Sequence, residues 1–365
     1  MQERLERNLR ELMQIPGLSG HEDRVRRAIE VRLADLGLSG RTDPLGNLIV
    51  SFNGDPDAPS VMVFAHMDQL GFVVRRIEDD GTIRVHRMGG VPERALASQA
   101  VLLCVGEGRD VVGVIANKNH HATGPDEKYT VLRATELAID TGHSSGDAVR
   151  NAGISIGTPV VYLPRVLPLA GGRIAGTSVD DRAGCAVLME VARALAARKG
   201  GATVHVVFSV QEEFNLRGAV VAGQALAPDI AIQIDLMLAC DTPDTTDLGD
   251  MRLGGGPGIS LYSFHGRGTL NGVIPHPAMV QLFEDAARDE NMPLQRSAQV
   301  GVLTDLSYVQ TVHQGVACID VGFPMRYSHS SLEVCELQDL VDLTTLILAA
   351  LSKIGADFPI ERGQA

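Results

Sequence analysis

A short apolar run that ends in two adjacent acids most constrains the fold of this chain. Residues 204–213 read VHVVFSVQEE, and the β-branched and aromatic residues of this run are typical of a buried strand in an α/β sheet. Open α/β sheets bind ligands at the carboxyl ends of their parallel strands, which is where residues that follow such a strand lie. Glu212 and Glu213 would repel each other there unless a cation or a proton lay between them. The stretch therefore predicts an α/β sheet with a charged site at its carboxyl edge.

Similar patterns place this strand in a large α/β domain. Apolar residues at helical spacing predict helices at residues 5–13, 25–36, 182–198, 216–226, 277–291 and 337–354. Short apolar runs predict further strands at residues 47–52, 61–65, 229–234 and 316–321. Ser19 and Glu22 have the spacing of a capping box before the second helix. We expect a mixed sheet flanked by helices.

Residues 72–164 have a different sequence pattern, without the helical spacing of the flanking regions. Short alternating strands are predicted at residues 72–77, 82–87, 100–105, 111–115 and 160–163, with glycine and proline between them. The polar stretch at 117–146 is expected to be loop with a short helix. We predict a small β-rich domain at 72–164, inserted into an α/β domain formed by residues 1–71 and 165–365.

Composition excludes several classes of partner. The 365 residues carry a formal charge of −13, which argues against binding to nucleic acid or to anionic membranes. No apolar run approaches the ~18–20 residues of a membrane span. The five cysteines are scattered and show no CxxC spacing, as expected for reduced thiols. The charged, helical amino terminus is unlike a signal peptide. The sequence therefore predicts a soluble, cytoplasmic protein.

Five candidate metal ligands are spread along the chain. His66, Glu213 and Asp235 follow or end predicted strands, Asp180 lies at a helix start, and His329 lies in a loop after a strand. Imidazole and carboxylate donors without a thiol suit zinc, cobalt or manganese. Two histidines and three acids are too many for one catalytic zinc, which takes three protein ligands. They fit two ions that share one bridging carboxylate, roughly 3.5–4 Å apart.

Each of these features also has an ordinary structural explanation. A His-x-Asp after a strand and a Glu-Glu pair are both common, and Asp180 and Asp181 could simply cap a helix. Their joint occurrence favours a dinuclear site. His120 and His121 lie in a polar loop and are expected to face solvent or an interface rather than substrate. The role of Asp305 stays open: it could form the floor of the site, form a pocket wall or cap a helix.

Seven stretches, taken together, resemble one family. They are AHMDQLGF (65–72), SVDDRAG (178–184), VQEEFNLRGA (210–219), IDLMLACDTPD (234–244), GGGPGI (254–259), LTDLSY (303–308) and PMRYSHSSLE (324–333), and they are spread over nearly the whole chain. With these motifs in this order, the chain is similar to the dinuclear-metal aminopeptidases of the tetrahedral, glutamyl-aminopeptidase type, which are also described as cellulase-like.

The resemblance implies a role for each candidate ligand. His66 and Asp235 would each hold one metal ion, and Asp180 would bridge the two ions. Glu213 and His329 would complete the second position. Each subunit would then carry two divalent ions, with zinc as the first choice and cobalt or manganese as alternatives.

The resemblance also implies a catalytic base and an assembly. Glu212 would be the general base, and Asp68 would orient the imidazole of His66. The fold would be a zinc-peptidase-like α/β core whose inserted β-domain makes the contacts of a homo-oligomer, from a dimer up to a dodecamer.

The expected function is that of a metal-dependent aminopeptidase, which removes N-terminal residues from peptides through a metal-activated water. A two-metal amidohydrolase or deacylase that acts on N-acylated small molecules, or on sugar or amino-acid catabolites, is the alternative. A non-enzymatic binding protein should have lost ligands or the base, and none is lost here. Side-chain preference, native metal and oligomer size are not specified by these motifs.

Overall fold

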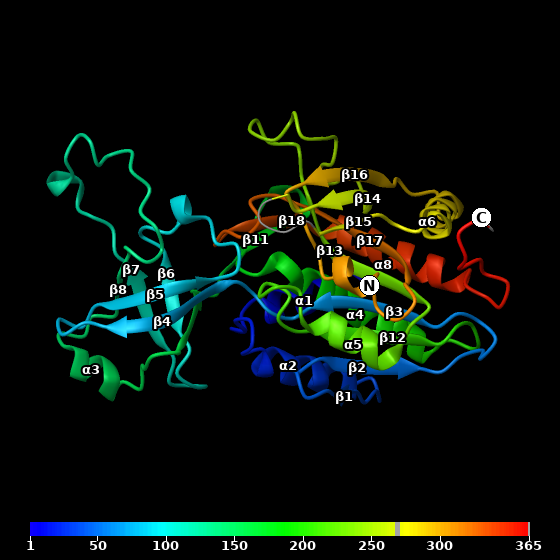
Figure 1. The fold of residues 1–365 in the computed structure, drawn as a ribbon, viewed down its shortest axis with the longest axis horizontal. Helices are drawn as coiled ribbons and strands as arrows, with labels where there is room; N and C mark the ends of the chain where they lie inside the picture. Colours follow the sequence, from blue (N-terminus) through cyan, green and yellow to red (C-terminus); the bar gives the residue numbers. More distant parts are fainter. Residues whose placement is uncertain (267–270, 364–365) are drawn as a thin grey trace.

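The larger of two lobes is built on a mixed sheet (Figure 1). The structure is a computed structural model that describes residues 1–266 and 271–363. Within these residues the sheet has nine strands in the order β1-β2-β12-β3-β13-β17-β14-β15, with β16 paired to β14. The strands are β1 (Arg41–Thr42), β2 (Leu48–Phe52), β3 (Val61–His66), β12 (Val204–Ser209), β13 (Ile230–Leu238), β14 (Gly258–Phe264), β15 (Gly272–Val273), β16 (Gln295–Val300) and β17 (Ala317–Met325). The predicted mixed sheet is confirmed.

Four parallel strands at the centre of the sheet bring the distant motifs together. Strand β3 lies between β12 and β13, and β17 follows β13. Their carboxyl ends therefore meet at one edge of the sheet. Strand β13 runs on to Leu238, because it stays paired with β17 over nine residues. Asp235 thus lies inside its strand, and the predicted strand end at this residue was wrong.

Helices cover both faces of this sheet. The larger apolar core packs five helices against one face, and a second cluster packs α5 and α7 against the other. Their bounds are α1 (Gln2–Leu12), α2 (Asp23–Ala34), α4 (Val179–Ala196), α6 (Pro277–Asp289) and α8 (Leu337–Ser352) on the first face, and α5 (Gly218–Leu226) and α7 (Leu306–Val309) on the second. Because the central strands are covered on both sides, they read as near-continuous apolar runs.

The second lobe is a closed barrel with its own core (Figure 1). Its strands are β4 (Gly71–Ile77), β5 (Ile83–Met88), β6 (Ala100–Leu103), β7 (Val111–Ile115), β8 (Ile139–Asp140) and β9 (Pro159–Tyr162), joined by α3 (Gly146–Asn151). The predicted inserted β-rich unit is confirmed as part of the fold, although the short β8 was not foreseen. The domain boundaries at 72 and 164 stay a prediction. His120 and His121 are exposed on the loop between β7 and β8, as expected.

A small sheet links the lobes, and one local prediction fails beside it. Strands β10 (Val166–Pro168), β11 (Arg173–Gly176) and β18 (Glu333–Glu336) form this sheet. The predicted capping box was wrong: no side chain caps the start of α2, and the Ser19 hydroxyl instead donates to Asp68 Oδ2 at 2.5 Å. Within the described ranges, no helix is long and apolar enough to cross a membrane.

Candidate metal centre

Five side chains from five separate segments meet at the carboxyl edge of the sheet. One group, His66, Asp180 and Asp235, offers three ligand atoms that all lie within 4.8 Å of one another. A second group with the same property consists of Asp180, Glu213 and His329. Asp180 belongs to both groups. The structure therefore brings all five sequence-predicted ligands together and gives Asp180 the central place.

The two carboxylate oxygens of Asp180 face different histidines. Its Oδ1 lies 3.0 Å from Nε2 of His66, and its Oδ2 lies 3.5 Å from Nε2 of His329. His329 Nε2 is also 3.8 Å from Oε1 of Glu213. One carboxylate that points one oxygen into each ligand group has the geometry of a bridging ligand.

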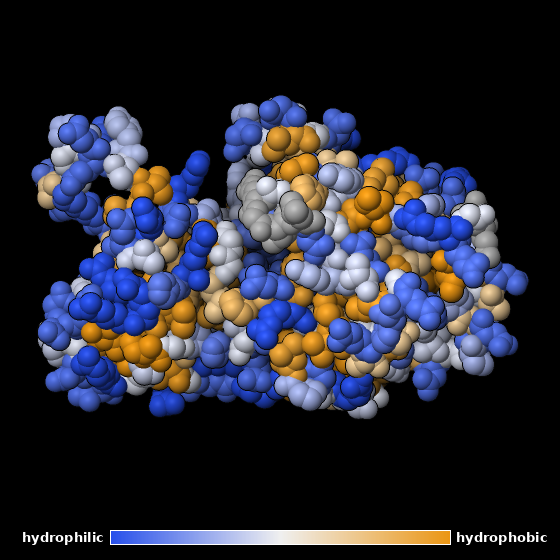
Figure 2. All heavy atoms as spheres, viewed as in Figure 1, coloured by the Kyte–Doolittle hydropathy of each residue, from blue (hydrophilic) through white to orange (hydrophobic). Residues whose placement is uncertain are grey.

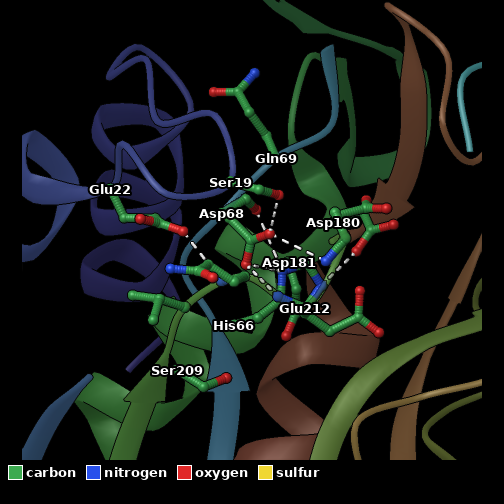
Figure 3. Close-up of polar contacts among 12 residues, drawn as sticks. Ser19, Glu22, His66, Asp68, Gln69, Asp180, Asp181, Ser209 and Glu212 are labelled. Atoms are coloured by element: carbon green, nitrogen blue, oxygen red, sulfur yellow. Dashed lines mark hydrogen bonds and ion pairs between the residues drawn. The ribbon is translucent and has the colours of Figure 1, made fainter. Parts of the chain in front are cut away.

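The start of α4 frees the Asp180 side chain for this role. Asp180 and Asp181 both have non-helical backbone angles. Asp181 Oδ1 accepts the backbone N–H of Gly184 at 2.8 Å, so it is Asp181 that caps the helix. The capping explanation that the sequence left open thus applies to Asp181. The side chain of Asp180 instead faces His66 (Figure 3) and, with its other oxygen, His329.

Asp68 has a larger role than orienting His66. Its Oδ1 accepts the backbone N–H of Glu212 at 3.0 Å (Figure 3). Its Oδ2 accepts the backbone N–H of Glu213, also at 3.0 Å. The imidazole Nδ1 of His66 lies 3.2 Å from the carbonyl oxygen of Asp68 and 3.4 Å from its Oδ1. Burial lowers the pKa of His66, but the acid oxygens beside both ring nitrogens outweigh this and raise it well above its ordinary range. A cation at Nε2 would displace the proton there, while the oxygens of Asp68 keep the proton on Nδ1. One buried acid therefore fixes both the histidine and the loop after β12.

Strained backbone surrounds the ligands. Ser178 (φ 60), Gln211 (φ 59) and His329 (φ 66) are non-glycine residues with left-handed angles, and each lies in or beside a ligand-bearing loop. This conformation costs about 1 kcal/mol or more for each such residue. Outliers of this kind gather at functional sites, where the surrounding structure holds them in place.

Negative charge is concentrated and uncompensated at this edge. Burial, together with the charges of neighbouring acids, raises the pKa of Glu213 and of Asp235 to about 7. Burial and the nearby acids also raise the pKa of Glu212 well above its ordinary range. Burial lowers the pKa of His329, but the charges of Glu213, Asp180 and Glu333 outweigh this and raise it to about 9. The site therefore favours cations strongly.

The residues present fit a pair of divalent ions. Among the residues that the structure describes, Glu213 Oε1 is buried and has no hydrogen-bond partner, so it is a carboxylate oxygen that could bind a cation. Imidazoles and carboxylates are the donors that zinc, cobalt and manganese accept. Glu212 is buried at 8% exposure and belongs to neither ligand group. It is thus a carboxyl beside the ion positions that need not bind either of them.

Sequence reasoning missed three residues that hold the ligands in place. Glu333 accepts the backbone N–H of Asp180 at 3.1 Å and that of His329 at 2.7 Å. Glu22 Oε1 accepts the backbone N–H of Gln211 at 3.0 Å. Ser19 holds Asp68. Glu333 closes the stretch PMRYSHSSLE, so its position in a family motif was the one available signal.

Asp305, whose role the sequence left open, lies beside Ser209, the last residue of β12. It is fully buried, and its Oδ2 is 3.4 Å from the hydroxyl of Ser209. Burial and the charges of Asp68 and Asp235 raise its pKa to about 8. It makes no side-chain cap to α7, which excludes the capping explanation.

A comparison with known protein families decides the assignment. The sequence profile of the M42 glutamyl aminopeptidases matches residues 46–346. The chain belongs to the M42 glutamyl aminopeptidase family. This M42 protein is therefore a hydrolase of the peptidase class, and the resemblance inferred from its motifs is confirmed.

Individual relatives extend over the full length of the M42 chain. It is 39% identical to SgcX of Escherichia coli strain K12 over 355 residues, and this match covers 96% of this chain and 94% of SgcX. It is 31% identical over 350 residues to the lysyl aminopeptidase of Pyrococcus furiosus, with coverages of 95% and 96%. The solved TET1 peptidase of Pyrococcus horikoshii superposes with a TM-score of 0.85 at 27% identity, with coverages of 95% and 99%, and assembles into a tetrahedron or a large octahedral shell.

Proposed function

We propose that this M42 protein is a metal-dependent aminopeptidase whose two ion positions are held by His66, Asp180, Glu213, Asp235 and His329. The observation that carries this is the pair of ligand groups that share Asp180. When bound, the ions would supply a polarised water and would stabilise negative charge on the scissile carbonyl. Metal dependence itself follows from the family. The ligand set and the identity of the metals belong to the proposal.

Glu212 is the proposed general base. Its raised pKa suits a group that accepts a proton from water and returns it to the leaving amine. The hydrogen bonds from the Glu212 and Glu213 amides to Asp68 hold the base next to the ligand positions. Asp68 thereby acts as a positioning residue for both Glu212 and His66.

The decisive experiment compares wild-type protein with Glu212→Gln on aminoacyl p-nitroanilides after loading with zinc, cobalt or manganese. The variant should lose activity by about 10²–10⁴-fold, the usual contribution of general base catalysis, while its metal content stays the same. Near wild-type turnover by the variant would exclude Glu212 as the base.

Substrates with an acetylated amino terminus provide a second comparison in the same activity assay. The aminopeptidase proposal predicts turnover of free amino termini only. Turnover confined to the acetylated series would instead identify a deacylase. Metal analysis of the protein as purified, followed by reloading with single ions, identifies the native metal.

Assembly through the barrel is also part of the proposal. Several apolar side chains of the barrel and its long loop face solvent: Val112 (53% exposed), Val114 (49%), Tyr129 (85%), Val131 (56%) and Leu132 (43%). Figure 2 shows hydrophobic patches on both lobes of the face in view. Patches of this kind mark interfaces. We therefore expect a homo-oligomer, and light scattering that finds only monomers would contradict this.

A cytoplasmic location likewise remains a proposal. It is supported by the five cysteines, which are all free thiols in the structure.

A further inference from the structure

A narrow cavity opens beside the proposed ligand Asp235. It runs over the face of the sheet between β13, β17, β14 and β16, and the residues that matter to its chemistry are Asp235, Met237, Ser263, Val302, Thr304 and Asp320. The room for the centres of water-sized groups is about 20 Å³. That is space for one or two water molecules, so the cavity suits the end of a slender side chain rather than an aromatic ring.

Asp320 gives the cavity its charge. The side chain is buried at 4% exposure, and Thr304 Oγ1 donates to its Oδ1 at 2.9 Å. Within the part of the chain that the structure describes, its other oxygen, Oδ2, has no hydrogen-bond partner, and neither has the buried hydroxyl of Ser263. Two such atoms in one cavity indicate a missing polar partner, because buried polar groups are almost always hydrogen-bonded.

The missing partner is a cation. Among residues 1–266 and 271–363, no lysine, arginine or histidine lines the cavity. Burial raises the pKa of Asp320 to about 7, because the nearby Thr304 hydroxyl offsets only part of the cost of burying the charge. A positively charged group beside Oδ2 would compensate this carboxylate, whereas a second acid would be repelled.

Strand register places Asp320 at the depth that a lysine side chain reaches. Asp235 pairs with Gly322 across β13 and β17, and Asp320 lies two residues before Gly322. At roughly 3.3 Å per residue, Asp320 lies about 7 Å further from the carboxyl edge than Asp235 does. The apolar residues Met237 and Val302 line the same cavity and can contact a methylene stem. The room for one or two water molecules therefore suits the ammonium group at the end of a four-carbon stem, with the rest of the stem reaching back toward Asp235.

We infer that this cavity receives the side chain of the substrate's N-terminal residue, and that Asp320 selects lysine by binding its ammonium group. The inference rests on the proposed aminopeptidase function. It names Asp320 as a specificity-determining residue that touches substrate, and it predicts that N-terminal glutamate is a poor substrate even though the family is named for glutamyl aminopeptidase activity.

The first test needs no variant. Lysine and norleucine p-nitroanilides have the same stem and differ by the ammonium group. The metal-loaded protein should have a kcat/KM for the lysine substrate at least about tenfold above that for norleucine, because an ion pair in a dry cavity favours the charged group. The glutamate substrate should be slowest. Equal values for lysine and norleucine would overturn the inference.

The second test removes the charge. Asp320→Asn should lower kcat/KM for the lysine substrate to the value for norleucine, and so abolish the preference. Asp57→Asn, which makes the same substitution at an exposed residue in the loop between β2 and β3, is the matched control and should keep the preference. Metal content is measured for both variants, because the charge of Asp320 also acts on Asp235. An unchanged preference in Asp320→Asn would exclude Asp320 as the selector.

A binding experiment separates failure of the cavity from failure of the proposed function. Calorimetry on metal-loaded Glu212→Gln protein compares lysinamide with norleucinamide. The lysine derivative should bind at least about tenfold more tightly even if no anilide is ever cleaved. Equal affinities would mean that the cavity holds water only, and would overturn the inference whether or not the protein is a peptidase.

Discussion

Raising the pH should lower the free energy of unfolding of the metal-free protein, and divalent ions should restore it. Burial raises the pKa of Glu213 and Asp235 to about 7 in the folded state, against ordinary values near 4. Groups whose pKa is raised by folding favour the folded state fully below the unfolded pKa and lose that contribution as the pH rises through the folded pKa. For these two acids the loss spans about pH 4 to pH 7. The raised pKa of His329, about 9, extends the same trend to higher pH.

The size of the effect follows from the shifts. At about 1.4 kcal/mol per unit, Glu213 alone accounts for about 3 kcal/mol and Asp235 for about 4 kcal/mol. The two acids interact through Asp180 and His66, so their contributions are not additive. We expect these two acids together to lower the free energy of unfolding by an amount on the order of 4 kcal/mol between pH 5 and pH 8, which is a large part of the value for an ordinary domain.

Urea unfolding followed by far-ultraviolet circular dichroism is the suitable assay, since the chain has no tryptophan. The midpoint in excess chelator should fall from pH 5 to pH 8. Saturating manganese or cobalt should raise it most at pH 8, where the ligands are deprotonated. The double variant Glu213→Gln, Asp235→Asn should lose a measurable part of the pH dependence, while the raised pKa values of Glu212, Asp305 and Asp320 maintain the rest. A metal-free midpoint that is constant or rises over this range would refute the reasoning.

Three further substitutions test single contacts. Asp68→Ala removes the acceptor for two loop amides, and competition with a chelator should show metal affinity lowered by about 10–100-fold. Gly184→Ala would place a Cβ 2.2 Å from Asp181 Oδ2, so the cap must move, and peptidase rates should fall by about tenfold or more. Ser19→Ala breaks the bond to Asp68 and should lower the free energy of unfolding by about 1–3 kcal/mol in urea titrations.

The sequence predicted the parts of the fold that local pattern determines. The run VHVVFSV could only be a buried strand, and the other central strands carry equally clear patterns. Five ligand candidates could be chosen because most of them follow such strands, and parallel strands end at a common edge. The short barrel strand β8 was missed because two residues carry no periodicity.

Contacts between distant segments could not be read from local pattern. Ser19 and Glu22 have the spacing of a capping box, yet tertiary hydrogen bonds to Asp68 and Gln211 use the same groups. The continuation of β13 past Asp235 depends on its pairing with β17, which lies about 90 residues later in the chain. The position of Asp320 depends on that same register, and for this reason the cavity had no sequence signature.

The insertion of the barrel between β3 and β12 has a consequence for how the chain folds. Val61 pairs with Val204 and with Ile230, so the middle of the sheet closes loops of well over 100 residues. The barrel strands, in contrast, pair largely with near neighbours in the chain. Because long loops are closed late, the barrel should form early and the central sheet should close last. The edge that carries the proposed metal ligands would then be among the final parts of the protein to become ordered during synthesis.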